Sequence, residues 1–319
     1  MTVVTRSAGL VFSMAAAIAV AVPSVAGAVT PTVVGPPQTT RHAATGYAET
    51  HPDLAPAGTN NFDCKPSAAH PRPVLLAHGT DTQAYTDWAA VAPALAADGY
   101  CVFALNYGKD PEKDTYGVGD IVSSAGEFSA FVDQVRSATG ADRVDVVGYS
   151  QGATVTRYYI NKLGGSQFVD QWVGLASPTY GGVMFGLVPI IRAIPGADEF
   201  VRDTFSVAVS EQMEGSDLLR SLNDGGDTVP GVHYTTIGSR VDEMIQPSGN
   251  IALRGPGAEN IVLQDLCPQN LTGHFRMPYD PYVIDIIRTS LDPTAERHAS
   301  CTAVPLGADI LQVVIDSNS

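Results

Sequence analysis

Residues 144–152, Val-Asp-Val-Val-Gly-Tyr-Ser-Gln-Gly, decide the fold of this chain. The apolar run at 144–147 predicts a strand, and a helix-like stretch follows from 153 to 163. Between them, Ser150 lies in the pattern G-x-S-x-G, a sharp turn that lifts the serine hydroxyl above a sheet, where a base can reach it. Gly148 and Gly152 have no Cβ, so the turn can close and the strand and helix can approach each other. The pentapeptide alone is a weak signal, but the strand before it and the helix after it make the prediction strong.

Short apolar strands and helices alternate on both sides of this turn. Strands are predicted at 74–77, 100–105, 172–176, 234–238 and 260–263, and further helices at 88–97, 120–138 and 279–291. Continuous apolar strands separated by helices indicate an α/β protein with a mostly parallel sheet that is covered on both faces. Catalytic groups of such sheets lie at the carboxyl ends of the strands, and Ser150 is expected at such an end.

One segment interrupts this alternation. Residues 181–231 separate two strands by about fifty residues, far more than an ordinary connection. The segment contains an apolar run at 184–191 and a helical stretch at 199–222, so it is too apolar for a solvated loop. We expect a cap whose apolar side lines a substrate pocket. The alternative is a helical excursion that completes the core, and periodicity does not distinguish the two.

The N-terminus has the pattern of an export signal. Arg6 gives a short basic region, residues 10–22 are apolar, and small residues at 26–28 resemble a cleavage site. We therefore expect residues 1–28 to be a secretory signal peptide and the mature protein to be extracellular. A membrane anchor is the alternative, but the apolar run is too short to span a bilayer comfortably and Pro23 interrupts its end.

Composition indicates one large domain after this signal. The chain has 319 residues, 45% of them hydrophobic, and we assign 61–319 to a single domain. Residues 29–60 are rich in Pro, Thr, Ala and Gly without sustained periodicity, which predicts an extended leader. The formal charge of −15 disfavours nucleic acid and anionic membranes as partners but not neutral lipid. No later segment is long and apolar enough to cross a bilayer, and we expect a monomer.

The four cysteines indicate disulfides and no metal site. An even number of cysteines in an exported chain favours two disulfides, with three possible connectivities. Their order along the chain favours Cys64 with Cys101 and Cys267 with Cys301. None has the C-x-x-C spacing of a zinc or redox site, and no histidine–aspartate cluster or dinucleotide pattern is evident. We therefore expect no cofactor. The acidic composition does not decide between the presence and the absence of a structural calcium ion.

A serine nucleophile needs a base. In proteins with this strand–turn–helix motif, the serine comes first along the chain, then the acid and then the histidine. Four of the seven histidines precede Ser150, at positions 42, 51, 70 and 78. His233 opens a strand, and His298 lies close to the C-terminus. His274 follows the last predicted strand, where Gly273 allows a tight loop and the next helix can fix that loop. We predict His274 as the general base and acid.

The acid should lie directly after the strand that comes before the last predicted one. Asp242 follows the strand at 234–238 and is our prediction for the carboxylate that orients the imidazole. Glu243 is adjacent but is expected to point elsewhere. The competitors are Asp224, Asp227 and Asp265, since the position of the acid varies most among such sites.

The oxyanion hole should combine two backbone N–H groups. One is expected from Gln151, the residue after the nucleophile, and the other from Thr80 in the loop after the strand at 74–77. The Thr80 hydroxyl can add a further donor. His78 lies in the same loop, and we interpret its ring as a structural brace.

Two stretches carry a resemblance to a known family. Residues 73–80, Pro-Val-Leu-Leu-Ala-His-Gly-Thr, and residues 144–152 continuing to 158–160 resemble the secreted bacterial class 2 lipases. The oxyanion pair Thr80 and Gln151, the stretch 242–247 and the two cysteine pairs are also similar to Candida-type lipase B. The resemblance covers roughly residues 60–301 and implies an α/β-hydrolase fold, ester hydrolysis and lipid substrates. It departs in 181–231, and Tyr149 stands where the bacterial relatives commonly have histidine.

These observations predict a secreted serine ester hydrolase, first of all a triacylglycerol lipase, able to work at a lipid–water interface. A short-chain esterase or a cutinase-like polyester hydrolase uses the same chemistry on another substrate. A non-catalytic binding protein on a hydrolase scaffold is the alternative from another class. The filled serine, histidine, acid and oxyanion positions speak against that last alternative.

Overall fold

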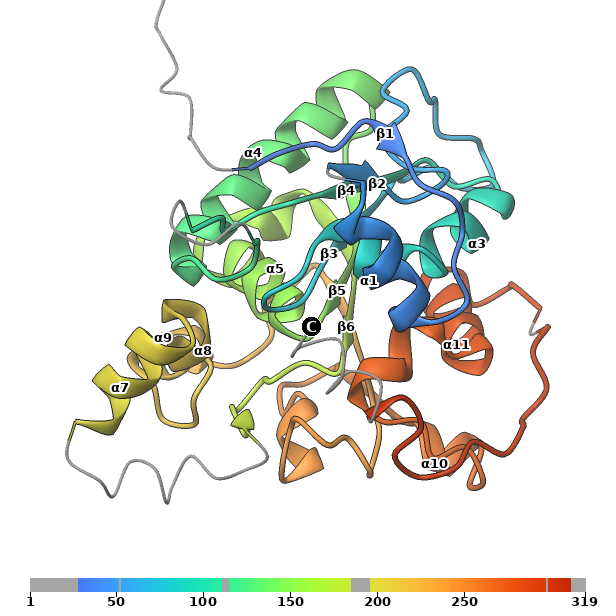
Figure 1. Ribbon diagram of the computed structural model, residues 1–319. Coiled ribbons are helices and arrows are strands. Elements are labelled where there is room, and N and C mark those ends of the chain that lie inside the picture. The colour runs from blue at the N-terminus through green and yellow to red at the C-terminus, as the bar shows by residue number, and fades with distance from the viewer. Residues whose placement is uncertain (1–27, 52, 111–114, 185–195, 297, 311–319) are drawn as a thin grey trace, which may run out of the picture.

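A parallel sheet of six strands forms the centre of the molecule. The computed structural model describes residues 28–51, 53–110, 115–184, 196–296 and 298–310. The strand order is β4-β3-β5-β6-β7-β8, and every neighbouring pair is parallel. The predicted parallel sheet is therefore confirmed, with helices packed on both of its faces (Figure 1). The strands are β3 (Val74–Ala77), β4 (Val102–Leu105), β5 (Val144–Tyr149), β6 (Val169–Leu175), β7 (His233–Gly238) and β8 (Glu259–Val262).

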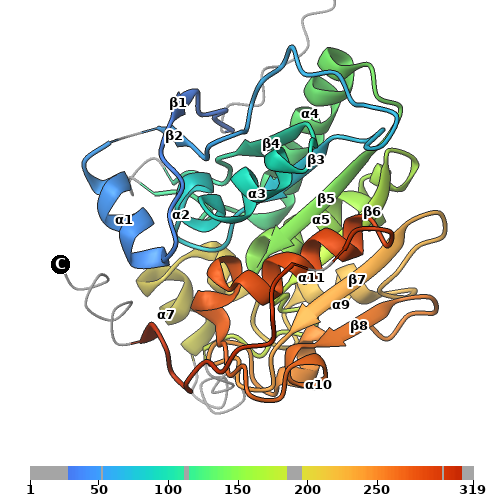
Figure 2. The same cartoon turned by 90° about the vertical axis from the view of Figure 1, so that its right-hand side faces the viewer.

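The central strands fill two hydrophobic cores, one on each face. Leu75 and Val146 point into the core under α4 and α5, whereas Leu76 and Val147 point into the core under α2, α3 and α11. Because successive side chains of a strand point to opposite faces, an uninterrupted apolar run is required to fill both cores. Figure 2 shows α3 and α11 across one face of the sheet. These helices are α2 (Ala84–Trp88), α3 (Val91–Ala97), α4 (Ile121–Thr139), α5 (Gln151–Lys162) and α11 (Pro281–Leu291).

The helix predicted at 88–97 is two shorter helices, so that prediction was wrong in its boundaries. The structure begins α2 at Ala84 and starts α3 at Val91. Trp88 and Val91 are both fully buried in the same core, on opposite sides of the break. Their shared burial produced the single apolar pattern in the sequence.

The leader at 29–60 is not simply extended, which corrects the sequence prediction. It contains α1 (Arg41–Glu49) between two short paired strands, β1 (Val33–Val34) and β2 (Leu54–Ala55). The hydroxyl of Thr40 accepts a hydrogen bond from the Ala43 N–H and so caps the helix. Ala44 and Ala48 are the buried face of α1, four residues apart. A face made only of alanines gives a weak hydrophobic signal, which is why periodicity did not show this helix.

The cap segment forms separate short helices in its described part, where the sequence predicted one helical stretch at 199–222. Its apolar run at 184–191 lies outside the described residues except for Met184. Ser206 and Ser216 each cap a new helix, because their hydroxyls accept the N–H of the residue three positions later. These caps divide the stretch. The helices are α7 (Ala197–Thr204), α8 (Val207–Glu211) and α9 (Asp217–Asn223).

The C-terminal part combines short helices with a disulfide. The disulfides join Cys64 to Cys101 and Cys267 to Cys301, which confirms the pairing that the chain order favoured.

The predicted signal peptide lies outside the described residues, apart from Ala28. Among the helices of the described ranges, none is both long and apolar enough to cross a membrane. The remaining elements are α10 (Leu263–Leu266) and the 3-10 helices η1 (Gly165–Gln167), η3 (Ser248–Ile251) and η4 (His274–Tyr279).

Candidate active site

Ser150 lies between β5 and α5, at the carboxyl end of a central strand. Its backbone has a φ of 53°, a strained conformation for a residue with a side chain. A Cβ added to Gly152 would lie 2.1 Å from the Ala77 carbonyl oxygen, and one added to Gly148 would lie 2.6 Å from Ala153. The turn therefore requires glycine on both sides of the serine, as the sequence predicted.

His274 lies next to this serine. Its Nε2 is 3.1 Å from the Ser150 Oγ, and its Nδ1 is 2.9 Å from Oδ2 of Asp242. The His274 residue is 4% exposed and Asp242 is fully buried. The structure thus brings together the three side chains that the sequence singled out from positions 150, 242 and 274.

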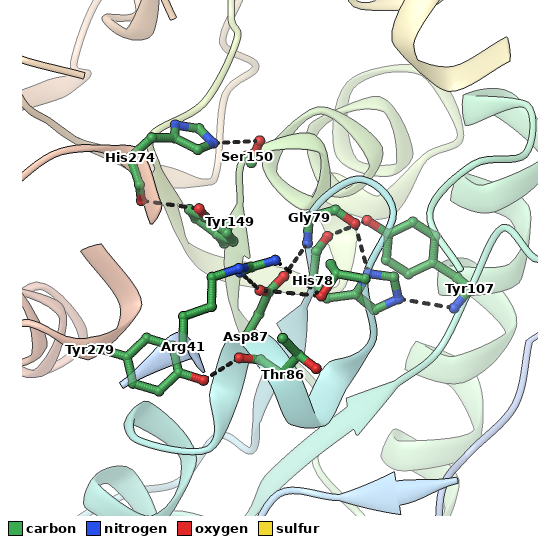
Figure 3. Close-up of polar contacts among 11 residues, drawn as sticks. Arg41, His78, Gly79, Thr86, Asp87, Tyr107, Tyr149, Ser150, His274 and Tyr279 are labelled. Carbon is green, nitrogen blue, oxygen red and sulfur yellow. Dashed lines mark hydrogen bonds and ion pairs between the residues drawn. The ribbon is translucent and has the colours of Figure 1, made fainter. Parts of the chain in front are cut away.

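The backbone around His274 fixes the ring. The His274 N–H donates to Oε2 of Glu243 over 2.8 Å. The Tyr149 hydroxyl donates to the His274 carbonyl over 3.0 Å, as Figure 3 shows. Glu243 therefore points to the His274 backbone and not to its ring, a role that sequence reasoning missed. Tyr149 has a similar role, which its position before the nucleophile did not reveal.

The competing acids have other partners. Asp227 accepts hydrogen bonds from the backbone of Arg254 and Gly255 and from the Tyr180 hydroxyl, and Asp265 pairs with Arg240. Asp224 lies at the C-terminal cap of α9. Among the described residues, Asp242 is the carboxylate within hydrogen-bonding distance of the His274 ring.

Thr80 and Gln151 face each other beside Ser150. Gln151 is the first residue of α5, so its N–H has no acceptor within that helix. Its side-chain Nε2 donates to Oγ1 of Thr80 over 3.1 Å and to the Gly117 carbonyl over 2.9 Å. The carbonyl partner fixes the orientation of the amide, because only the nitrogen can donate to it.

A second amide holds the Thr80 hydroxyl. Nε2 of Gln212, at the end of α8 in the cap, donates to Thr80 Oγ1 over 3.2 Å and to the Ala208 carbonyl over 3.0 Å. The hydroxyl therefore accepts from two amides, which leaves its own hydrogen to donate to a third group. Sequence reasoning missed Gln212, because nothing in a helical pattern marks a glutamine that reaches across from the cap.

Comparison with known proteins shows the family to which the chain belongs. A family model described as Lipase (class 2) matches residues 71–274, well over half of the chain. The chain belongs to the class 2 lipase family. The match begins just before β3 and ends at His274, so it includes the turn at Ser150 and Asp242.

Solved structures of two lipases have the same α/β-hydrolase fold. Lipase B of Aspergillus fumigatus is 19% identical with a TM-score of 0.57, and the match covers 81% of this chain and 58% of the fungal one. The mature form of the Bacillus licheniformis lipase BlEst2 is 17% identical with a TM-score of 0.52, and 71% of this chain matches 94% of it. This chain therefore spans little more than half of the fungal lipase but nearly all of the bacterial one.

A cavity opens beside the serine in this class 2 lipase. Its volume is about 210 Å³, and it lies between residues 79–82, described residues of the segment 181–231 and the loop that carries His274. One wall of the cavity is apolar. Its residues come from the segment 181–231 and from the loop that follows Asp242, and they also contact one another in a small hydrophobic cluster. The residues of this wall are Val183, Met184, Val209, Met244 and Ile245.

The helices of the segment 181–231 differ in what they contact. Val209 of α8 lines the cavity, whereas Leu218 and Leu219 of α9 belong to the main core under α4 and α5. That the segment forms a cap over a substrate pocket stays a prediction.

The other wall of the cavity is polar, and part of it comes from the leader. Arg41 of α1 reaches the cavity and forms an ion pair with Asp87 of α2. Behind this pair, Nδ1 of His78 donates to the Gly79 carbonyl over 2.8 Å, while Nε2 accepts from the Tyr107 N–H over 3.4 Å. Burial lowers the pKa of His78 to about 4, so the ring is neutral and braces the loop as the sequence predicted. Arg41 was not predicted, since it lies in the segment interpreted as an extended leader.

Metal chemistry has no evident ligand set in the part of the chain that is described. No group of three or more His, Cys, Asp or Glu side chains gathers there as a metal site would require.

Proposed function

We propose that this protein is a secreted serine ester hydrolase, a triacylglycerol lipase that works through an acyl-enzyme. One observation carries the proposal: a continuous row of hydrogen bonds from Ser150 through His274 to the buried Asp242. That is the arrangement in which a serine hydroxyl becomes a nucleophile.

In the proposed reaction, Oγ of Ser150 attacks the ester carbonyl while Nε2 of His274 takes the hydroxyl proton. Asp242 holds the hydrogen on Nδ1 and stabilises the imidazolium that forms. The alcohol leaves with the proton from Nε2, and the acyl group stays on the serine. A water molecule then attacks the acyl carbon while Nε2 of His274 takes its proton. The bond between the acyl carbon and Oγ breaks, Ser150 regains a proton from His274, and the carboxylic acid is released.

The oxyanion of each tetrahedral intermediate would lie between Thr80 and Gln151. The backbone N–H of each residue is proposed as a donor, and the Thr80 hydroxyl as a third, because Gln151 and Gln212 already occupy its acceptor side. Donors held in place before the reaction stabilise the developing charge without reorganisation.

The apolar wall formed by the cap supports an acyl chain as the group bound there. Family membership supports an ester substrate as well. We further propose residues 1–28 as a signal peptide and residues 181–231 as a cap on a hydrolase domain that follows the leader. The two disulfides support an extracellular location.

A short-chain esterase is the second candidate, because the cavity of about 210 Å³ is below the usual size range of ligand pockets. A series of p-nitrophenyl esters of rising chain length, run beside emulsified triglyceride, separates the two. Sustained activity on long chains and on the emulsion supports the lipase, and a sharp loss beyond short chains supports the esterase.

The test of the chemistry is labelling with a fluorophosphonate, followed by ester turnover. Wild-type protein should be labelled and active, and Ser150→Ala should lose both while keeping its thermal unfolding transition. Ser123→Ala, which changes an exposed serine of α4, is the matched control and should behave as wild type. Near-normal turnover by Ser150→Ala would end the proposal.

A further inference from the structure

A buried carboxylate lies directly behind the oxyanion loop. Asp87 of α2 is fully buried, and its Oδ2 accepts a hydrogen bond from the Gly79 N–H over 2.8 Å. A Cβ added to Gly79 would lie 3.4 Å from this oxygen and 3.4 Å from the Ser150 Cβ. Gly79 is therefore in contact with the carboxylate on one side and with the nucleophile on the other, and Thr80 is the next residue.

A carboxylate in this position is costly unless a positive charge pairs with it. Arg41 supplies that charge: its guanidinium pairs with Oδ1 of Asp87 and lies 3.4 Å from Oγ1 of Thr82. Burial opposes the charged form of Arg41, but Asp87 together with the nearby Tyr149 and Tyr279 outweighs it, so the arginine pKa is raised above its ordinary value. Figure 3 shows the contacts that run from Arg41 through Asp87 to Gly79.

The leader holds Arg41 firmly in this place. Ala44 and Ala48 of α1 pack against Tyr85, Ala89 and Tyr279 in a separate small core. Before the helix, the Tyr85 hydroxyl donates to the Pro36 carbonyl over 2.7 Å and accepts from the Gln38 side chain over 3.1 Å. The arginine side chain is only 14% exposed. The ion pair is thus a docked part of the site and not a loose surface contact.

We propose that Arg41 is a positioning residue of the active site, which acts through Asp87 to fix the oxyanion loop at Gly79 and Thr80. This inference rests on the proposed ester hydrolysis. It makes the leader a working part of the enzyme. Oxyanion donors must lie within a few tenths of an ångström of their productive positions. If Asp87 loses its positive partner, the loop at Gly79 and Thr80 should shift. The enzyme should then bind the transition state less well, with a smaller effect on substrate binding.

The experiment is a double-variant cycle on the full mature chain. Arg41→Met removes the charge with similar length, Asp87→Asn keeps an oxygen for the Gly79 N–H, and the double variant removes both charges. Arg41→Lys is the conservative change. Arg220→Met is the matched control, because Arg220 forms a solvent-exposed ion pair with Asp217 on α9, away from the cavity.

We expect Arg41→Met to lower kcat about 100-fold with little change in KM for a neutral ester, a size typical of impaired oxyanion stabilisation. Arg41→Lys and the double variant should recover at least about tenfold of that loss, since each restores charge balance around the buried group. Arg220→Met should keep the wild-type kcat.

Inhibition by an alkyl boronic acid gives a second readout. Its tetrahedral adduct on Ser150 places an oxygen where the oxyanion would form, so its Ki should rise in parallel with the fall in kcat/KM. A purely structural role for Arg41 would lower the unfolding temperature but leave kcat and Ki of the folded protein unchanged.

The outcomes separate this inference from the function on which it rests. Wild-type protein that neither reacts with fluorophosphonate nor turns over esters contradicts the proposed function. Active wild-type protein with an equally active Arg41→Met contradicts the positioning role alone. Should Arg41→Met fail to fold, Asp87→Asn carries the test, because it leaves the Arg41 charge unbalanced beside Gly79. A lower kcat in Asp87→Asn that the double variant restores supports the inference, and a wild-type kcat in Asp87→Asn overturns it.

Discussion

Asp242 uses its two carboxylate oxygens for two different tasks around His274. Oδ2 is 2.9 Å from Nδ1 of the imidazole, whereas Oδ1 accepts the backbone N–H groups of Met244 over 2.9 Å and Ile245 over 2.8 Å. The loop after β7 thus wraps around the carboxylate and fixes which oxygen meets the ring. The acid could not rotate without breaking two backbone hydrogen bonds.

Asp242→Asn should therefore abolish most activity while it leaves the fold intact. The two backbone donors will hold the amide oxygen, so the amide nitrogen must face Nδ1. Nδ1 then has to accept, the hydrogen moves to Nε2, and Nε2 can no longer take the proton of Ser150. We expect kcat to fall about 10⁴-fold, measured with a soluble p-nitrophenyl ester. Glu243→Gln, which keeps an oxygen for the His274 N–H, should lose far less, and equal losses in the two variants would contradict this reasoning.

Thr80→Val tests the hydroxyl that we propose as an oxyanion donor. The change removes the side-chain donor and leaves the backbone N–H and the side-chain volume nearly unchanged. We expect kcat to fall about 100-fold with KM nearly constant, the usual size for one oxyanion donor. Thr80→Ser keeps the hydroxyl and should retain most of the activity. If Thr80→Val matches wild type, the backbone donors alone suffice and the two glutamines have only a packing role.

Glu211 should make the stability of the cap depend on pH. Burial and the neighbouring Asp120, with which it shares a hydrogen bond, raise the pKa of Glu211 to about 7, while Arg202 opposes this rise. Its carboxylate also accepts the Ile121 N–H of α4 over 2.8 Å, so it ties α8 to the body of the protein. Between pH 4.5 and 7 the folded state holds a proton that the unfolded state releases, so the stability contributed by this group falls as pH rises.

Glu211→Gln removes this titration. As the pH rises from 5 to 8, the unfolding free energy of the variant should increase relative to that of wild type. The change in this difference should be on the order of 1 kcal/mol once solvent screening of the half-buried group is included. Thermal unfolding at both pH values, at constant ionic strength, measures the difference. Glu259→Gln, an exposed glutamate of β8, is the control and should follow wild type at both. A difference between Glu211→Gln and wild type that is the same at pH 5 and pH 8 would argue against the titration.

The two disulfides offer a matched comparison, because they close loops of nearly equal length, with sequence separations of 37 and 34. Removing either by Cys→Ser should cost roughly 3 kcal/mol of unfolding free energy. Only the Cys267–Cys301 bond lies beside the segment that leads to His274, where the Leu271 N–H bonds to the Val304 carbonyl over 3.1 Å. We expect its loss to lower kcat as well, whereas loss of Cys64–Cys101 should leave the kcat of the folded protein unchanged. Equal kcat values in the two variants, each calculated per folded protein, would show that the segment around Cys301 and Val304 does not influence the loop that carries His274.

Much of the fold could be predicted because its signals are local. The strand, turn and helix around Ser150 lie within about twenty residues, and the glycines on either side reveal the steric requirement of the turn. Fully apolar strands indicated a sheet covered on both faces, and chain order selected Asp242 and His274 from a larger set of candidates. Each of these inferences needs only the spacing of residues along the chain and a rule about how such elements pack.

The sequence by itself therefore determined the parallel sheet and the strand–turn–helix that carries Ser150, and it favoured the pairing of the cysteines that the structure has. Only the tertiary structure decided that Arg41, Asp87, Gln212 and Glu243 surround the site. Asp87 lies on α2, and the other three come from the segment before β3, from the end of α8 and from the loop after β7. Arg41 meets Asp87, Gln212 meets Thr80 and Glu243 meets the His274 backbone across sequence separations of 46, 132 and 31 residues. A contact of that kind leaves no periodic trace in the sequence, because it depends on where two separately folded elements come to lie against each other.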